Sequence, residues 1–187
     1  MKKRIALIAS IVLVLAIAVS GTLAYFTSEE KAENIITTGS IDISVDEWAD
    51  EDKTEAFPEE GVENAMPGDA VTKIVEVTND GTGDAWIRVS VEKVIELAEG
   101  TEGEPDLDLI ILDVDTENWT LQDGYYYYNE ALAAGETAPA LFTTVTLDTT
   151  MGNMYQNCTI NINVQAQAVQ AANNGETALE AEGWPEE

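Results

Sequence analysis

From position 158 the chain reads Cys158-Thr159-Ile160-Asn161-Ile162-Asn163-Val164-Gln165-Ala166-Gln167-Ala168. Every even position is apolar and every odd position is polar. Successive side chains of a β-strand point to opposite faces, so this stretch predicts one face made of Cys, Ile, Val and Ala and one face made of Thr, Asn and Gln. Such a period of two is typical of a half-buried strand, with one face on a core and the other in water.

The same alternation, or a high content of β-branched and aromatic residues, predicts further strands. They cover residues 41–46, 71–78, 87–92, 107–114, 125–128 and 141–147. Turn-forming residues lie between them, and residues 47–63 form an acidic stretch that we expect to be a long exposed loop. Seven or more short strands predict an all-β fold, an antiparallel β-sandwich of jelly-roll-like or immunoglobulin-like kind, with one short helix over Glu176–Glu182.

Composition excludes several functions. The 187 residues include 36 acidic and 8 basic ones, a formal net charge of −28, so nucleic acids and anionic membrane surfaces are not expected as electrostatic partners. The absence of histidine rules out Ser/His and Cys/His nucleophiles and every zinc site with a His ligand. The single cysteine, Cys158, cannot form an intrachain disulfide, and its strand pattern predicts a buried apolar role.

The N-terminus has the order of an export signal. A basic start, Met1-Lys2-Lys3-Arg4, precedes an apolar run that ends in small residues, which predicts a signal peptide of residues 1–24 cleaved between Ala24 and Tyr25. The alternative is a retained anchor, because the uncharged run of residues 5–28 is long enough to span a bilayer. Removing the signal leaves five basic and 36 acidic residues, a charge of −31. The lack of a disulfide in an exported chain suits the exterior of a Gram-positive-type bacterium.

Several blocks of sequence now combine into a resemblance. They are residues 21–29, 34, 38–43, 67–69, 77–81, 85–89, 123–129, 135–137 and 168–171. In this order they resemble the TasA/CalY (camelysin) family of exported proteins, which are cut by a SipW-type signal peptidase. The resemblance implies a secreted or cell-surface structural protein, a jelly-roll-like subunit of a biofilm matrix that assembles with itself or a related subunit. Camelysin is described as a metalloprotease, but without a His-Glu-x-x-His motif we do not expect enzymatic activity.

The resemblance also implies a mode of assembly. In fibre-forming members, the freed N-terminal segment inserts as a strand into a neighbouring subunit. Residues 25–40 form this segment here, ahead of a β-sandwich domain of residues 41–187, and its apolar residues suit a donated strand. These candidate assembly residues are Tyr25, Phe26, Ile35 and Ile36. For residues 25–36 donation and disorder both remain open, whereas residues 41–45 are better explained as the domain's own first strand.

Two further candidate sites carry alternatives. Four consecutive tyrosines, Tyr125, Tyr126, Tyr127 and Tyr128, put two rings on each face, and Trp86 lies opposite the apolar face of its strand. An exposed aromatic face would support a monomeric glycan- or protein-binding module, although one ring pair in the core and one covering the sheet is the simpler interpretation. Carboxylates offer a calcium site. The best cluster is Asp106, Asp108, Asp113, Asp115 and Glu117, but it lacks EF-hand spacing, so we expect no cofactor and keep calcium as the weaker alternative.

Overall fold

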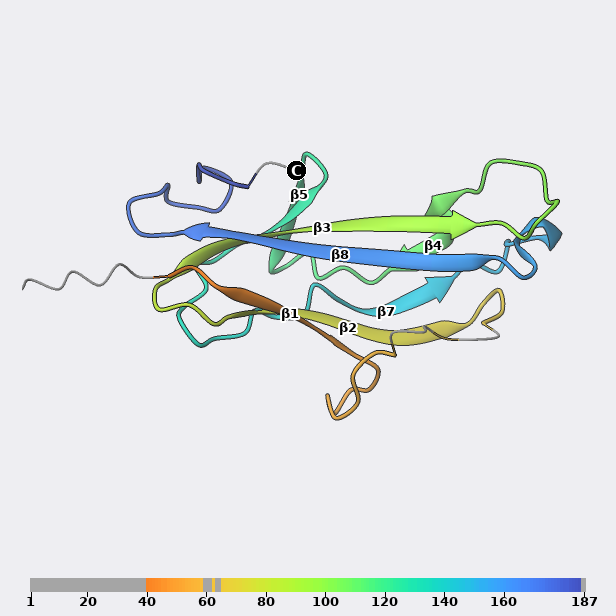
Figure 1. Cartoon of the computed structure of the whole chain (residues 1–187), viewed down its shortest axis with the longest axis horizontal. Coiled ribbons are helices and arrows are strands. Elements are labelled where there is room, and N and C mark those ends of the chain that lie inside the picture. Colours follow the sequence, from red (N-terminus) through yellow and green to blue (C-terminus); the bar gives the residue numbers. More distant parts are fainter. Residues whose placement is uncertain (1–39, 59–61, 63–64, 186–187) are drawn as a thin grey trace, which may run out of the picture. The chain divides into compact units, whose positions relative to one another are not determined.

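The computed structural model describes residues 40–58, 62 and 65–185. Within them, two four-stranded antiparallel sheets face each other (Figure 1). Sheet A has the order β1-β2-β7-β4, and sheet B has the order β5-β6-β3-β8. The strands are β1 (Ile43–Trp48), β2 (Ala70–Asn79), β3 (Ala85–Glu96), β4 (Ile110–Leu112), β5 (Trp119–Gln122), β6 (Tyr125–Tyr128), β7 (Phe142–Leu147) and β8 (Thr159–Gln170). The predicted all-β sandwich is confirmed.

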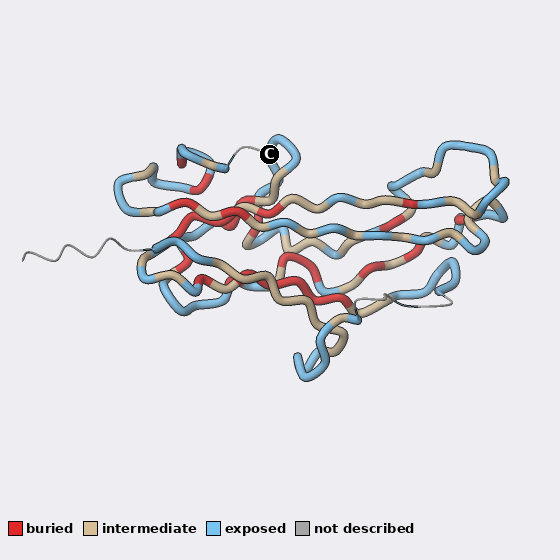
Figure 2. The backbone as a smooth tube through the Cα atoms, viewed as in Figure 1, coloured by how far each residue is buried: buried red, intermediate tan, exposed pale blue. Residues whose placement is uncertain are grey.

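Most of the alternating stretch that begins at residue 158 lies in strand β8, which takes part in the longest strand pairing of the fold. Strands β3 and β8 pair antiparallel from Ala85↔Gln170 to Glu96↔Thr159. On β3, Ile87 and Val89 are fully buried and belong to the main core cluster. Buried residues lie along strands of both sheets (Figure 2). Trp119 on β5 lies in the same core at 1% exposure, and its ring packs 5.3 Å from that of Tyr128. The period of two therefore fixes which face of each strand is buried.

A single buried asparagine organises the connection from sheet A to sheet B. Asn79 ends β2 with no exposed surface, and its Nδ2 donates to the carbonyls of Gly83 and Leu132 at 2.9 and 2.8 Å. Its Oδ1 accepts from the backbone N–H of Gly81 at 3.0 Å. Gly81 has no room for a side chain, because a Cβ there would lie 2.5 Å from the Ser40 carbonyl oxygen. The turn at residues 79–84 thus has a buried polar centre whose hydrogen bonds are satisfied.

Two strand predictions were incomplete. Residues 107–114 contain a short 3₁₀ turn, Leu107–Leu109, followed by only three strand residues, because the Asp106 carboxylate accepts from the Asp108 N–H and caps the turn. Strand β5 was missed altogether. Its sequence, Trp-Thr-Leu-Gln, is too short to show a period, and pairing with the tyrosine strand β6 decides its conformation.

The predicted helix over Glu176–Glu182 is wrong. Those residues form turns, and within them only the Glu180 N–H to Thr177 carbonyl bond has helical character. Asn174 closes the segment into a loop, because its amide group exchanges two hydrogen bonds with the backbone of Glu182. Gly175 and Gly183, both at positive φ, bound a stretch too short to offset the cost of helix nucleation.

Two segments fold back onto the sheets. We call residues 49–57 the acidic loop, which returns along β1 and lies on the side of sheet A away from sheet B (Figure 1). We call residues 172–185 the C-terminal segment, which covers the outer face of sheet B around Trp86 and Tyr127. Of the acidic stretch predicted as a long exposed loop, residues 47 and 48 belong to β1, whereas residues 51–56 are exposed as predicted.

Candidate functional site

The side of the sandwich where β1 and β8 lie is open. Each of these strands has a sheet neighbour on one side only, β2 for β1 and β3 for β8. A groove of about 510 Å³ runs between them and is lined by Val45, Glu47, Ile162, Asn163 and Val164. The two sheets therefore leave part of the apolar interior accessible along this side.

Polar Glu47 and Asn163 line the groove together with apolar side chains, and the apolar ones are only half covered. Ile160, Ile162 and Val164 of β8 pack against the core but stay partly exposed, whereas Ile87 and Val89 on the neighbouring β3 are fully buried. An added strand would bury these side chains and also satisfy the free backbone groups of an edge. Sequence reasoning placed these residues in strands but did not identify them as a site.

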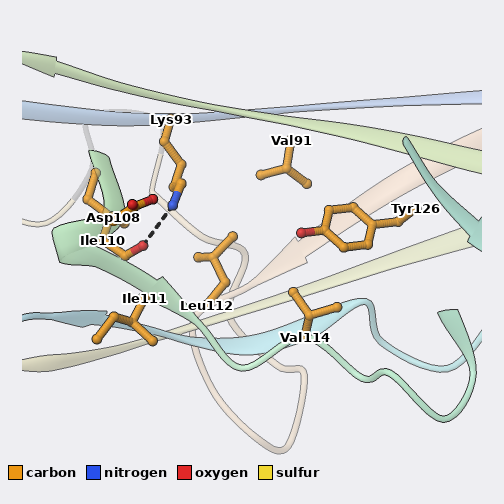
Figure 3. A pocket seen from close by; sticks show the side chains of 8 residues that line it. All are labelled: Val91, Lys93, Asp108, Ile110, Ile111, Leu112, Val114 and Tyr126. Carbon is orange, nitrogen blue, oxygen red and sulfur yellow. Dashed lines mark hydrogen bonds between the residues drawn. The ribbon is translucent and has the colours of Figure 1, made fainter. Parts of the chain in front are cut away.

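A second hollow, of about 260 Å³, lies toward β4 (Figure 3). Val91, Leu112 and Val114 form apolar walls, and the Tyr126 hydroxyl points into the space. Lys93 also lines it, and its Nζ donates to the Ile110 carbonyl at 3.0 Å. Because Lys93 belongs to sheet B and Ile110 to sheet A, this bond ties the two layers together at the β4 side.

The candidate aromatic residues are largely covered. Tyr128 at 8% exposure and the half-buried Tyr126 face the core. Tyr125 and Tyr127 lie on the outer face of sheet B with the C-terminal segment against them, and the Tyr127 ring meets that of Trp184 edge-on at 5.8 Å. Trp86 was expected to be partly exposed but is 6% exposed, because its Nε1 donates to the Asn174 carbonyl at 2.7 Å beneath the same segment.

A cation sits at the centre of this covered aromatic face. The Arg88 guanidinium carbon lies 3.9 Å from the Tyr125 ring centroid and 4.7 Å from that of Trp184. Arg88 Nε donates to Gln167 Oε1 at 2.7 Å, which satisfies a side chain that is 7% exposed. Arginine between aromatic faces is a stable arrangement, so this cluster serves to hold the C-terminal segment in place.

The carboxylates proposed for calcium are used to hold turns. Asp113 accepts from the N–H and hydroxyl of Thr143 and the N–H of Thr144, and Asp115 accepts from Glu117 and Asn118. Burial raises the pKa of Asp113, but the Thr143 and Thr144 hydrogen bonds outweigh it and leave the pKa below its usual value. Within residues 40–58, 62 and 65–185, no three His, Cys, Asp or Glu side chains converge as a metal site would require.

The remaining predicted residues are placed as follows. Cys158 is half-buried against the core, and burial raises the pKa of its thiol, as expected for an unreactive cysteine. The cleavage pair Ala24 and Tyr25 and the assembly residues Phe26, Ile35 and Ile36 lie outside the described residues. In the part of the chain that is described, no helix has the length and apolar character needed to cross a bilayer.

Comparison with known proteins gives one family. A family model described as "Camelysin metallo-endopeptidase" matches residues 1–111, which include β1 to β3 and the first strand residues of β4. No curated protein matches the chain.

That description implies a metal ion, which donor groups of this chain would have to hold. A peptidase zinc ion is held by neutral imidazoles and carboxylates, and this chain has no histidine. Asp113 and Asp115 are engaged by backbone and side-chain donors, and Cys158 has a raised pKa where a ligand needs a thiolate. These residues do not fit a catalytic zinc centre.

Proposed function

Since the match covers residues 1–111 of 187, the chain belongs to the camelysin family, and from that premise we propose that it is an exported structural subunit of the cell surface or biofilm matrix that assembles with copies of itself. The observation that carries this proposal is the open side of the sandwich. There the groove between β1 and β8 presents half-covered apolar side chains beside two edge strands.

The segment that follows the export signal supplies the donated strand in this proposal. A SipW-type peptidase cuts between Ala24 and Tyr25 and frees the new N-terminus. Tyr25, Phe26, Ile35 and Ile36 of one copy then cover the groove of the next. Strand addition joins backbone groups and buries alternate side chains. The contact is head-to-tail and does not close, so it propagates into a filament.

Charge controls when this assembly occurs. With a charge of −31 after signal removal, copies repel each other at neutral pH and low salt. Salt, divalent cations, or acidification toward the carboxylate pKa near ~4 should therefore promote assembly. The proposed role is non-enzymatic and needs no cofactor, which suits a donor set without imidazole.

The test compares two forms of the chain, one beginning at Tyr25 and one at Thr38. Light scattering and negative-stain electron microscopy follow their size across salt, calcium and pH. We expect filaments from the longer form and none from the shorter one. Filaments from both forms would contradict strand donation, and monomers throughout would contradict self-assembly and favour a binding module.

A matched pair of variants sharpens this test. In the form beginning at Tyr25, Ile36→Asp removes an apolar side chain that covers the groove and adds one negative charge, and filament yield should fall by at least about tenfold. Asn34→Asp adds a negative charge near it without removing apolar surface. It should leave filament yield close to that of the unaltered chain.

A further inference from the structure

The C-terminal segment covers an aromatic surface on the outer face of sheet B. Trp86 and Tyr127 lie beneath it at 6% and 7% exposure, and Ala178 and Ala181 of the segment are buried against them. A segment that few buried side chains hold opens more readily than the sheet it covers. The exposure of this aromatic surface therefore depends on whether the segment stays docked.

Asn174 holds the segment in place through three polar groups. Its side-chain Nδ2 donates to the Glu182 carbonyl at 3.0 Å, and its Oδ1 accepts from the Glu182 N–H at 2.9 Å. Its backbone carbonyl accepts from Trp86 Nε1 at 2.7 Å. One residue thus closes the segment into a loop and also ties it to β3.

The residue that follows, Gly175, makes this asparagine chemically labile. Of all the asparagines in the sequence, only Asn174 precedes a glycine. Glycine has no side chain to shield its backbone nitrogen, so that nitrogen can reach the amide carbon of the preceding asparagine. The Gly175 N–H has no hydrogen bond among the described residues, so none has to break there before reaction.

We propose that Asn174 is a site of spontaneous deamidation, and that docking of the C-terminal segment controls the reaction. The Gly175 nitrogen loses its proton and bonds to Asn174 Cγ, and Nδ2 leaves as ammonia. Water then opens the resulting succinimide ring, at one carbonyl to give aspartate and at the other to give isoaspartate. A water molecule enters and an ammonia molecule leaves, with no change in oxidation state.

The docked segment opposes this reaction. The Nδ2 group can leave only when its bond to the Glu182 carbonyl breaks, and movement of Cγ toward the Gly175 nitrogen disturbs the bond from the Glu182 N–H. Gly175 itself has little room to move, since a Cβ there would lie 3.0 Å from the Glu180 carbonyl carbon and 3.1 Å from the Ala181 nitrogen. Reaction therefore proceeds from the released segment, and its rate follows the population of that released state.

Deamidation prevents the segment from docking again. An ionised aspartate is only an acceptor, so at position 174 it would face the Glu182 carbonyl without the donor that Nδ2 supplied. An isoaspartate routes the main chain through Cγ, which moves the carbonyl that accepts from Trp86 into a side branch. Release that lasts long enough for reaction is therefore irreversible, and the aromatic surface stays exposed. This change concerns the outer face of sheet B and does not depend on the proposed self-assembly.

The first test measures the rate of the reaction. The purified chain beginning at Tyr25 is incubated at mildly alkaline pH, and mass spectrometry of its peptides follows the gain of about 1 Da at Asn174. Arg88→Ala and Trp184→Ala each remove ring contacts that hold the segment. In both variants deamidation should be faster by the same factor as Glu182 N–H exchange, at least about tenfold.

The two variants also make this test decisive. Circular dichroism shows whether the sheets are retained, and Trp184→Ala, which alters no strand, serves alone if Arg88→Ala fails to fold. A deamidation rate that does not follow Glu182 exchange would overturn control by docking. Absence of reaction at Asn174 in the urea-unfolded chain would overturn the site itself.

A matched pair of variants tests the loss of docking. Asn174→Asp copies the aspartate product, and exchange of the Glu182 N–H and the Trp86 indole N–H should quicken by at least about tenfold. The control, Asn173→Asp, adds the same charge at an exposed side chain that has no hydrogen bond among the described residues. Asn173 lies at a φ of 59°, which aspartate also tolerates, so the control should exchange like the unaltered chain. Unchanged exchange in Asn174→Asp, or equal acceleration in both variants, would overturn irreversible release.

Discussion

The acidic loop and the C-terminal segment perform the same task by different chemistry. Each folds back onto a sheet and anchors there through a basic residue of the strand below it. The loop uses one ion pair, between Lys53 and Glu76 of β2 at 2.6 Å, and one cation–π contact, in which Lys73 of β2 lies 4.1 Å from the centroid of Phe57. Lys73 also pairs with Glu47 of the neighbouring strand β1. The C-terminal segment uses aromatic contacts with Arg88, whose described partners include no carboxylate.

Salt and acid should weaken the ion pair that holds the acidic loop, but they should affect the arginine–aromatic contacts of the C-terminal segment much less. Exposed ion pairs are screened by salt and lost when carboxylates are protonated. Arginine between aromatic rings depends on neither condition to the same degree. In a chain that is proposed to assemble on acidification or in salt, the sheet B cover should persist while the acidic loop loosens.

The largest effect is expected from Arg88→Ala. This change removes both ring contacts and leaves the buried Gln167 Oε1 without its donor, so the free energy of unfolding should fall by about 2–3 kcal/mol. Urea denaturation measures it, and hydrogen exchange should show the C-terminal segment released. Arg88→Lys, which keeps the charge but not the planar fork, should recover part of the loss. A change below about 0.5 kcal/mol would refute an anchoring role.

A smaller effect is expected from Lys73→Ala. The side chain is 6% exposed, and its loss leaves Glu47 without a cation and Phe57 without its partner. Because Glu47 is a third exposed, the unfolding free energy should fall by only about 1–2 kcal/mol. Lys73→Met keeps most of the packing and measures the charge alone. If the methionine variant is as stable as the unaltered chain, the pair contributes only packing.

Acid should weaken sheet A through Asp113. Hydrogen bonds from Thr143 and Thr144 hold its pKa below the usual value despite the opposing effect of burial. The folded-state pKa is lowered, so the stabilisation is present above about pH 4 and is lost as pH falls through the lower folded value. Asp113→Asn should lower stability at pH 7 by about 0.5 kcal/mol, a small amount because the side chain is exposed to solvent. Urea midpoints from pH 7 to pH 2 check this, and an identical acid dependence in the variant would contradict it.

The smallest effect is expected from Lys53→Met. The Lys53 side chain is 44% exposed, so its pair with Glu76 should contribute only about 0.3 kcal/mol. Added salt should reduce even this difference. If the unfolding free energy fell by more than about 1 kcal/mol, the ion pair of the acidic loop would be far stronger than expected, and the contrast with the C-terminal segment would no longer hold.

The sequence predicted the strands in which apolar and polar residues alternate. It missed the elements whose conformation depends on contacts between residues far apart in the chain. The alternation at Cys158–Ala168 predicted β8 and the face that packs on the core, but it did not predict that Gln167, on the opposite face, is buried. Strand β5 and the outer cluster around Arg88 have no local pattern, because they depend on pairing with β6 and on a segment far along the chain. The helix prediction at Glu176 failed because Asn174 binds Glu182 across the segment.

The open edge was only partly predictable. The alternating residues identified β8 as a strand. The local sequence does not show that β8 has a neighbour on one side only, because this depends on the order of strands in sheet B. The uncharged run from Thr149 to Gly175 was the available signal for an unprotected edge. The assembly segment was predicted from resemblance, and it lies outside the described residues.

The placement of the basic residues also bears on resistance to proteases. A protease that cuts after lysine or arginine needs an exposed, yielding stretch of backbone around that residue. Of the four basic residues in the described part, Lys73, Arg88 and Lys93 lie within paired strands, and only Lys53 lies in a loop. Trypsin-like enzymes would therefore find one accessible bond in this part of the fold, in a loop whose two ends stay joined at β1 after the cut.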